Sequence, residues 1–155
     1  MELKAFIIRL LEEKGGEIHG RVQLQKIVYF CKALGVNVNA SYKLYIYGPY
    51  SQQVANALQD CVADDILVES NGIIKKGIEC DDYLGALSGS GNDLSDRSQE
   101  IVRDVLQICN QMNTKELEIT ATTFFIDRQQ KALFGKDDRN AVIRRKNVQK
   151  KNIRI

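Results

Sequence analysis

The fold is decided by the stretch LQKIVYF at residues 24–30, taken together with YGPYS at residues 47–51. In the first stretch apolar residues recur at helical spacing, and Tyr29 and Phe30 widen the apolar face. A helix that is apolar over so much of its circumference is expected at the centre of a core. The second stretch predicts the end of a strand, a tight turn and the start of a helix that Ser51 caps.

Apolar residues at helical spacing predict helices on both sides of these two stretches. The pattern covers residues 2–14, 21–34 and 52–63. The polar positions of the second of these helices are Arg21, Gln23, Gln25, Lys26 and Lys32. An aromatic and branched run at residues 42–47 predicts a strand, which Gly48-Pro49 ends.

Asn71-Gly72 predicts a β-hairpin because it stands between two apolar runs, residues 66–69 and 73–76. Residues 17–20 are short enough for a turn or a very short strand. The order helix, helix, strand, helix and hairpin predicts a winged-helix-like core with an added strand between its last two helices. The expected core residues are Phe6, Leu10, Leu24, Ile27, Val28, Phe30, Leu44, Ile46, Val54, Leu58, Ile66 and Val68.

The chain is expected to have three parts. Residues 1–87 form the winged-helix-like domain, and a Ser- and Gly-rich linker follows it. Residues 94–135 contain two helical patterns joined by a short connection, which predicts an antiparallel helical hairpin packing on the first domain. Residues 136–155 are a basic tail. The predicted fold class is α+β, mostly α, with a small hairpin or sheet.

No catalytic or metal-binding constellation is present in the sequence. The single histidine, His19, has no partner at ligand or catalytic spacing. The four cysteines also lack paired spacing and are expected as buried, reduced thiols; they are Cys31, Cys61, Cys80 and Cys109. We therefore expect no enzymatic activity, no metal and no cofactor. No run approaches the roughly 20 apolar residues of a membrane span, and no export signal is recognisable, so a cytoplasmic location is expected.

One hypothesis of function is nucleic-acid binding. A winged-helix protein places a helix such as residues 52–63 in the major groove, where amide side chains can bind adenine. The candidate residues are Gln52, Gln53 and Asn56 on that helix, Lys75 and Lys76 on the hairpin, and Arg144, Arg145, Lys146, Lys150 and Lys151 in the tail. Arg21, Lys26 and Lys32 are further candidates for phosphate contacts.

The distribution of charge limits this hypothesis. The formal net charge is only +2, and the helix at residues 52–63 carries no Lys or Arg. Asp60, Asp64 and Asp65, on and after that helix, would repel phosphate. The tail carries a net charge of +6 and the other residues sum to −4, so the tail is the better electrostatic candidate for DNA.

The alternative hypothesis is a protein-interaction module, such as an antitoxin-like or adaptor subunit, without direct DNA binding. Tyr42, Tyr45, Tyr47 and Tyr50 lie within nine residues, which is consistent with core packing or with an aromatic contact surface. The candidate partner-binding residues are Tyr45, Tyr47 and Tyr50. A homodimer is compatible with either hypothesis.

The paired stretches at residues 24–30 and 47–51 resemble the YwgA-like family of uncharacterised prokaryotic proteins. They are more distantly similar to the Panacea domain of SocA-like antitoxins, which also has a Leu-Gln-Lys helix and a Tyr-Gly-Pro turn. The resemblance covers about residues 1–80. It implies a non-enzymatic, winged-helix-like protein, sometimes encoded near mobile or defence loci, and carries over no catalytic residue. The antitoxin relatives act by protein contacts as much as by DNA binding.

Overall fold

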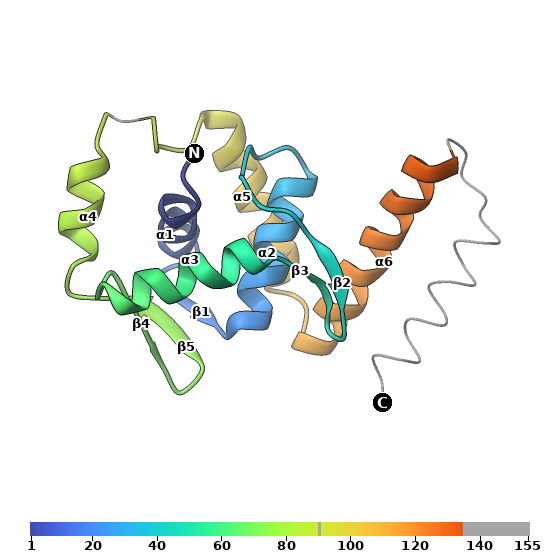
Figure 1. The fold of residues 1–155 in the computed structure, drawn as a ribbon, viewed down its shortest axis with the longest axis horizontal. Helices are drawn as coiled ribbons and strands as arrows, with labels where there is room; N and C mark the ends of the chain where they lie inside the picture. The colour runs from blue at the N-terminus through green and yellow to red at the C-terminus, as the bar shows by residue number, and fades with distance from the viewer. Residues whose placement is uncertain (90, 135–155) are drawn as a thin grey trace.

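The computed structural model describes residues 1–89 and 91–134 (Figure 1). Its elements are α1 (Leu3–Glu13), β1 (Glu17–His19), α2 (Arg21–Ala33), β2 (Lys43–Tyr45), β3 (Gly48–Tyr50), α3 (Gln52–Ala63), β4 (Leu67–Ser70), β5 (Ile73–Lys76), α4 (Cys80–Leu87), α5 (Asp96–Cys109) and α6 (Thr114–Phe134). The predicted fold class, α+β and mostly α, is confirmed. Residues 135–155, and with them the basic tail, lie outside the described residues.

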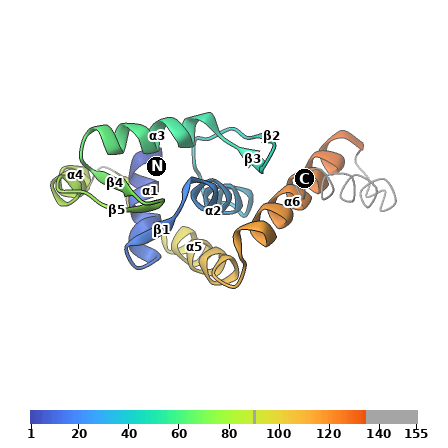
Figure 2. The same ribbon diagram turned by 90° about the horizontal axis from the view of Figure 1, so that it is seen from below.

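Helix α2 is the central element of the molecule, as its apolar circumference predicts. It lies between α3 on one side and α5 and α6 on the other (Figure 2). Its Leu24, Ile27 and Val28 are fully or almost fully buried, in a core shared with α1, α3, the sheet and α5. Phe30 is only partly buried and packs against the edge of that core.

A three-stranded antiparallel sheet closes one end of this core. Its strand order is β1-β5-β4, so the short strand at Glu17–His19 pairs with the returning strand of the hairpin. The turn is the predicted one, because Asn71 and Gly72 have φ values of 53° and 75°. A two-residue hairpin turn needs positive φ at both central residues to match the right-handed twist of its strands. Ile18 and Ile74 pair on the buried face of the sheet.

Three of the expected core residues are instead exposed. Successive residues of a strand point to opposite faces, and in β4 the inward position is taken by Leu67, which leaves Val68 exposed. Leu44 and Ile46 are exposed because the segment forms only a two-stranded sheet with β3 and nothing covers its outer face among the described residues.

The predicted strand at residues 42–47 is also wrong in extent. It ends at Tyr45, the chain turns at Ile46 and Tyr47, and Gly48–Tyr50 forms the second strand rather than the turn. Pro49 is tolerated in this strand because a two-stranded sheet has only edge strands, where a missing N–H donor costs little.

The two C-terminal helices do not form the expected packed hairpin. They diverge from their connection (Figure 2), and the principal contacts of both α5 and α6 are with α2 rather than with each other. Helix α6 also packs against β3.

The central position of α2 gives a stability prediction. Ile27 is fully buried, so Ile27→Ala should lower the free energy of unfolding by about 2–5 kcal/mol, through lost burial and the cavity that remains. Denaturant unfolding followed by circular dichroism measures the change. Ile78→Ala is the matched control, since Ile78 is 86% exposed, and it should change the free energy by less than about 0.5 kcal/mol. Equal effects of the two substitutions would contradict the central role of α2.

Candidate functional site

Gln25 joins the two stretches of sequence that decide the fold. Its Nε2 donates to the backbone oxygen of Ser51 at 2.9 Å, and the backbone N–H of Ser51 donates to its Oε1 at 2.9 Å. Both residues are buried. Buried backbone groups need hydrogen-bond partners, and here one amide side chain pairs with both backbone groups of the N-cap residue of α3, whose carbonyl also accepts from the N–H of Ala55. The Ser51 hydroxyl in turn accepts from the N–H of Val54, which caps α3 as predicted.

Lys26 makes the neighbouring contact. Its Nζ donates to the backbone oxygen of Pro49 at 3.0 Å, and its side chain is 2% exposed. Burial lowers the pKa of Lys26 to about 8, and Glu118 on α6 opposes that shift. We call the Gln25 and Lys26 contacts with Ser51 and Pro49 the backbone clamp. Because Lys26 lies inside this clamp, it is not available for the phosphate contact that the sequence suggested.

Helix α6 packs against β3 as well. Gly48 has φ +104°, and a Cβ there would lie 2.5 Å from the hydroxyl oxygen of Thr122. That distance is too short for any side chain, so α6 approaches the backbone of β3 at a position where only glycine fits. Strand β3 is therefore held between α2 and α6 (Figure 1).

The clamp holds a hairpin whose outer side chains are exposed. We call residues 43–50 the aromatic hairpin. Leu44 is 37% exposed, Tyr45 53%, Ile46 76% and Tyr47 57%. Tyr45 and Tyr50 pack edge to face across the hairpin, with ring centroids 4.9 Å apart. The predicted tyrosines thus lie together, with an exposed isoleucine at the turn.

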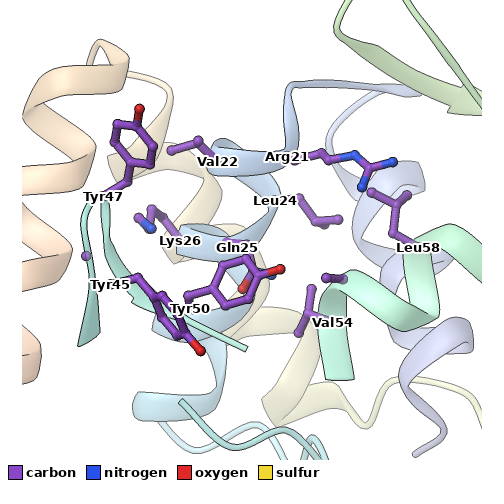
Figure 3. Close-up of a pocket in the computed structure, with 12 residues that line it drawn as sticks. Arg21, Val22, Leu24, Gln25, Lys26, Tyr45, Tyr47, Tyr50, Val54 and Leu58 are labelled. Atoms are coloured by element: carbon purple, nitrogen blue, oxygen red, sulfur yellow. The ribbon is translucent and has the colours of Figure 1, made fainter. Parts of the chain in front are cut away.

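An apolar pocket of about 120 Å³ opens beside the aromatic hairpin (Figure 3). Leu24, Val54 and Leu58, from α2 and α3, line one side of it, and the three tyrosines of the hairpin line the other. Its volume is about four times the ~30 Å³ that a water molecule occupies in the liquid. The pocket can therefore take one side chain but is smaller than the cavities that hold cofactors.

A second, more polar pocket of about 330 Å³ adjoins the first. It is lined by Ser41, Lys43, Tyr45, Tyr50, Gln52, Gln53 and Asn56. Gln52, Gln53 and Asn56, the predicted DNA-binding residues of α3, therefore lie beside two of the predicted partner-binding tyrosines. Gln52 Nε2 donates to Asn56 Oδ1 at 2.9 Å, and Gln53 bonds to Ser41. Tyr45 and Tyr50 line both pockets.

The structure does not bring the hairpin lysines to this site. Lys75 Nζ lies 3.1 Å from the carboxylate of Glu17, and Lys76 Nζ lies 3.4 Å from that of Glu12 and 3.8 Å from that of Asp81. Arg21 forms a two-bond ion pair with Glu69, at 2.8 and 2.9 Å. The remaining nominated residues, Arg144, Arg145, Lys146, Lys150 and Lys151, lie outside the described residues.

The other reactive side chains that the structure describes do not form a further site. No group of three His, Cys, Asp or Glu side chains there is placed to hold a metal ion. All four cysteines are buried and free, and burial raises the pKa of Cys31 to about 12. His19 is exposed, with Nε2 3.5 Å from a Glu17 carboxylate oxygen. No helix within the described ranges is long and apolar enough to span a membrane.

Sequence reasoning missed the clamp itself. Gln25 and Lys26 were assigned as polar positions of α2, yet both are buried. The available signal was two adjacent polar residues in the middle of a helix with a wide apolar face. Such residues need buried partners, but the spacing of one helix does not say which distant backbone atoms supply them.

The fold and this site describe a mostly helical α+β protein with an aromatic hairpin clamped to its central helix. No family model matches the chain. The chain is similar to a curated protein of Bacillus subtilis (strain 168), uncharacterized protein YwgA. The two are 27% identical over 115 residues, which are 72% of this chain and 68% of that protein. This distant similarity supports the predicted resemblance to YwgA-like proteins, whereas the similarity to Panacea domains stays a prediction.

Removing the Gln25 amide should destabilise the protein. Gln25→Met keeps the length of the side chain but leaves the buried Ser51 N–H without its partner, at about 1–3 kcal/mol, and removes one of the two donors to the Ser51 C=O, at about 1 kcal/mol. We expect the free energy of unfolding to fall by about 2–4 kcal/mol in urea titrations. Gln59→Met, at an exposed position of α3, is the control and should have little effect. A small loss in Gln25→Met would mean that water or another group replaces the amide.

Lys26 should add a pH dependence to stability. Its pKa is about 8 in the folded chain and 10.5 ordinarily, so between these values the unfolded state binds more protons and stability rises with pH. Each pKa unit is worth about 1.4 kcal/mol, which gives about 3 kcal/mol over this window. Unfolding measured from pH 7 to pH 10 should show the wild type gaining stability relative to Lys26→Met. Lys131→Met, at an exposed position of α6, should follow the wild type. A constant difference between wild type and Lys26→Met would refute the shift.

Proposed function

We propose that this chain is a non-enzymatic protein-interaction module whose contact surface is the aromatic hairpin with its apolar pocket. The observation that carries the proposal is the exposure of four consecutive apolar or aromatic side chains, Leu44 to Tyr47, on a hairpin that is firmly held. Exposed apolar groups on a rigid support favour binding, because their burial releases water without ordering the chain. The four buried, free cysteines fit a cytoplasmic location for such a module.

Tyrosine suits a contact surface for energetic reasons. It offers a large apolar ring and a polar hydroxyl with few rotatable bonds, and it is enriched where binding energy concentrates. Tyr45 and Tyr50 already restrict each other by their edge-to-face contact. Little conformational entropy then remains to be lost when a partner covers them.

The two pockets define the chemistry of the partner. The apolar pocket has room for one aliphatic or aromatic side chain, and the polar pocket beside it offers amides and Lys43. A buried apolar anchor with a polar rim is the usual anatomy of a protein interface. The partner is therefore a protein that presents one apolar anchor residue surrounded by polar groups. Such contacts fit an antitoxin-like or adaptor role.

DNA binding by a winged-helix-like module is the second candidate. It is favoured by the element order of residues 3–76, by the strand order β1-β5-β4 and by the exposed amides of α3. It ranks second because Lys75 and Lys76 are engaged by carboxylates and would have to break those ion pairs to reach phosphate. The sequence up to residue 134 also carries a net charge of −4, which opposes approach to DNA.

Site-specific photocrosslinking tests the first proposal. A photoreactive phenylalanine analogue at position 47, in cells that naturally produce the chain, should crosslink to one defined protein. The same analogue at position 78 should not, although Ile78 is 86% exposed. The purified partner should then bind Tyr47→Ser at least tenfold more weakly than wild type, a change of about 1.4 kcal/mol. Ile78→Ser should leave Kd unchanged.

Two results would contradict this proposal. The first is equal crosslinking at positions 47 and 78. The second is crosslinking of position 47 to nucleic acid, together with binding of duplex DNA whose affinity falls steeply as salt rises. That second result would instead support the DNA-binding candidate.

A further inference from the structure

A third pocket lies away from the aromatic hairpin, between the C-terminal half of α2 and α6. Its volume is about 230 Å³. Tyr29, Tyr42 and Phe125 provide its aromatic wall, and Lys32 and Arg128 provide two cations from the facing helices. Tyr29 packs against Tyr42 at 5.1 Å and against Phe125 at 5.9 Å between ring centroids. The pocket thus combines a flat apolar wall with positive charge.

Both cations are held in place by neutral groups. Lys32 Nζ donates to the backbone oxygen of Ala40, and Arg128 Nη1 donates to that of Ala33 at 2.9 Å. Arg128 also lies 5.7 Å from the centre of the Phe124 ring. Neither cation forms an ion pair with a carboxylate among the described residues. Within residues 1–89 and 91–134 no carboxylate therefore neutralises them, unlike Arg21, Lys75 and Lys76.

The Tyr42 hydroxyl is buried and has no hydrogen-bond partner in the described chain, so Tyr42 offers its ring rather than its hydroxyl to the pocket. Tyr29 lies close enough to Arg128 for that cation to oppose the burial that raises the pKa of Tyr29 to about 12. A ligand that accepts hydrogen bonds and carries negative charge would pair with Lys32 and Arg128.

We infer that this pocket binds a carboxylate attached to a flat or short apolar body. The carboxylate would lie between Lys32 and Arg128 and accept from their remaining N–H groups, and the apolar body would pack on the aromatic wall. The dipole of α2 places roughly half a negative charge at the C-terminal end of the helix, and this charge repels an anion. The two full positive charges beside it outweigh that effect. Two sources share this chemistry, a free organic acid and the C-terminus of a peptide that ends in an aromatic residue.

Calorimetric titration of the full chain tests the site. Phenylacetate and the tripeptide Gly-Gly-Phe with a free C-terminus are the two acidic probes, and phenylacetamide and the C-amidated tripeptide are their neutral counterparts. We expect at least one acid to bind and its amide to bind at least tenfold more weakly. The acid that binds more tightly identifies the source. Lys32→Met and Arg128→Gln should each weaken it about tenfold, and added salt should also weaken it.

Matched variants make the test specific. Lys131→Met removes an exposed cation from the same helix as Arg128 and should leave the affinity unchanged. Tyr42→Phe keeps the aromatic wall and removes only the buried hydroxyl, so it should leave both the affinity and the circular dichroism spectrum unchanged. Tyr47→Ser should have no effect, so a failure of this site and a failure of the proposed protein contact are distinguishable. Equal binding of acid and amide, equal loss in Lys131→Met, or no binding of either acid at millimolar concentration would overturn the inference.

Discussion

The structure depends on the need to pair buried backbone groups where a strand passes into a helix. Between β3 and α3 the backbone is buried, and Gln25 and Lys26 of α2 bond to Pro49 O and to the N–H and C=O of Ser51. Helix α3 itself supplies one further donor to the Ser51 carbonyl, the N–H of Ala55 at 3.2 Å. An unpaired buried group costs more than an ordinary hydrogen bond gains. The strand is therefore fixed to the central helix by necessity, and the side chains at its turn project from a defined position.

Local signals were sufficient to predict most of the fold. The start and end of α3 follow from the Ser51 cap and its apolar spacing, and the β4–β5 turn follows from Asn71-Gly72. The errors occur where a distant contact decides the outcome. Leu44 and Ile46 have strand propensity, but they lie on a two-stranded sheet and stay 37% and 76% exposed. The partners of Gln25 and Lys26 lie 26 and 23 residues further along, so helical periodicity could not reveal that these polar residues are buried.

Both candidate sites include residues of α2, at different ends of the helix. Its first turns carry the backbone clamp and the apolar pocket, and its last turns carry Lys32 and the wall of the cationic pocket. Helix α6 borders both, through Thr122 beside Gly48 and through Arg128. The sequence predicted the tyrosines and amides of the first site but not that they share a pocket. Lys32 and Tyr42 of the second site were noted separately, but their meeting with Arg128 was not predictable from spacing, because Ala33 and Arg128 are 95 positions apart.

The backbone clamp also bears on how the sequence can diverge among relatives. Gln25 and Lys26 hydrogen-bond to main-chain atoms, which every amino acid possesses apart from the missing N–H of proline. The contacts therefore fix the identities of the helix residues without fixing those of the residues they hold. A change of side chain at position 49 therefore calls for no compensating change at position 26. Methods that infer proximity from correlated substitutions would then overlook the contact that organises the fold.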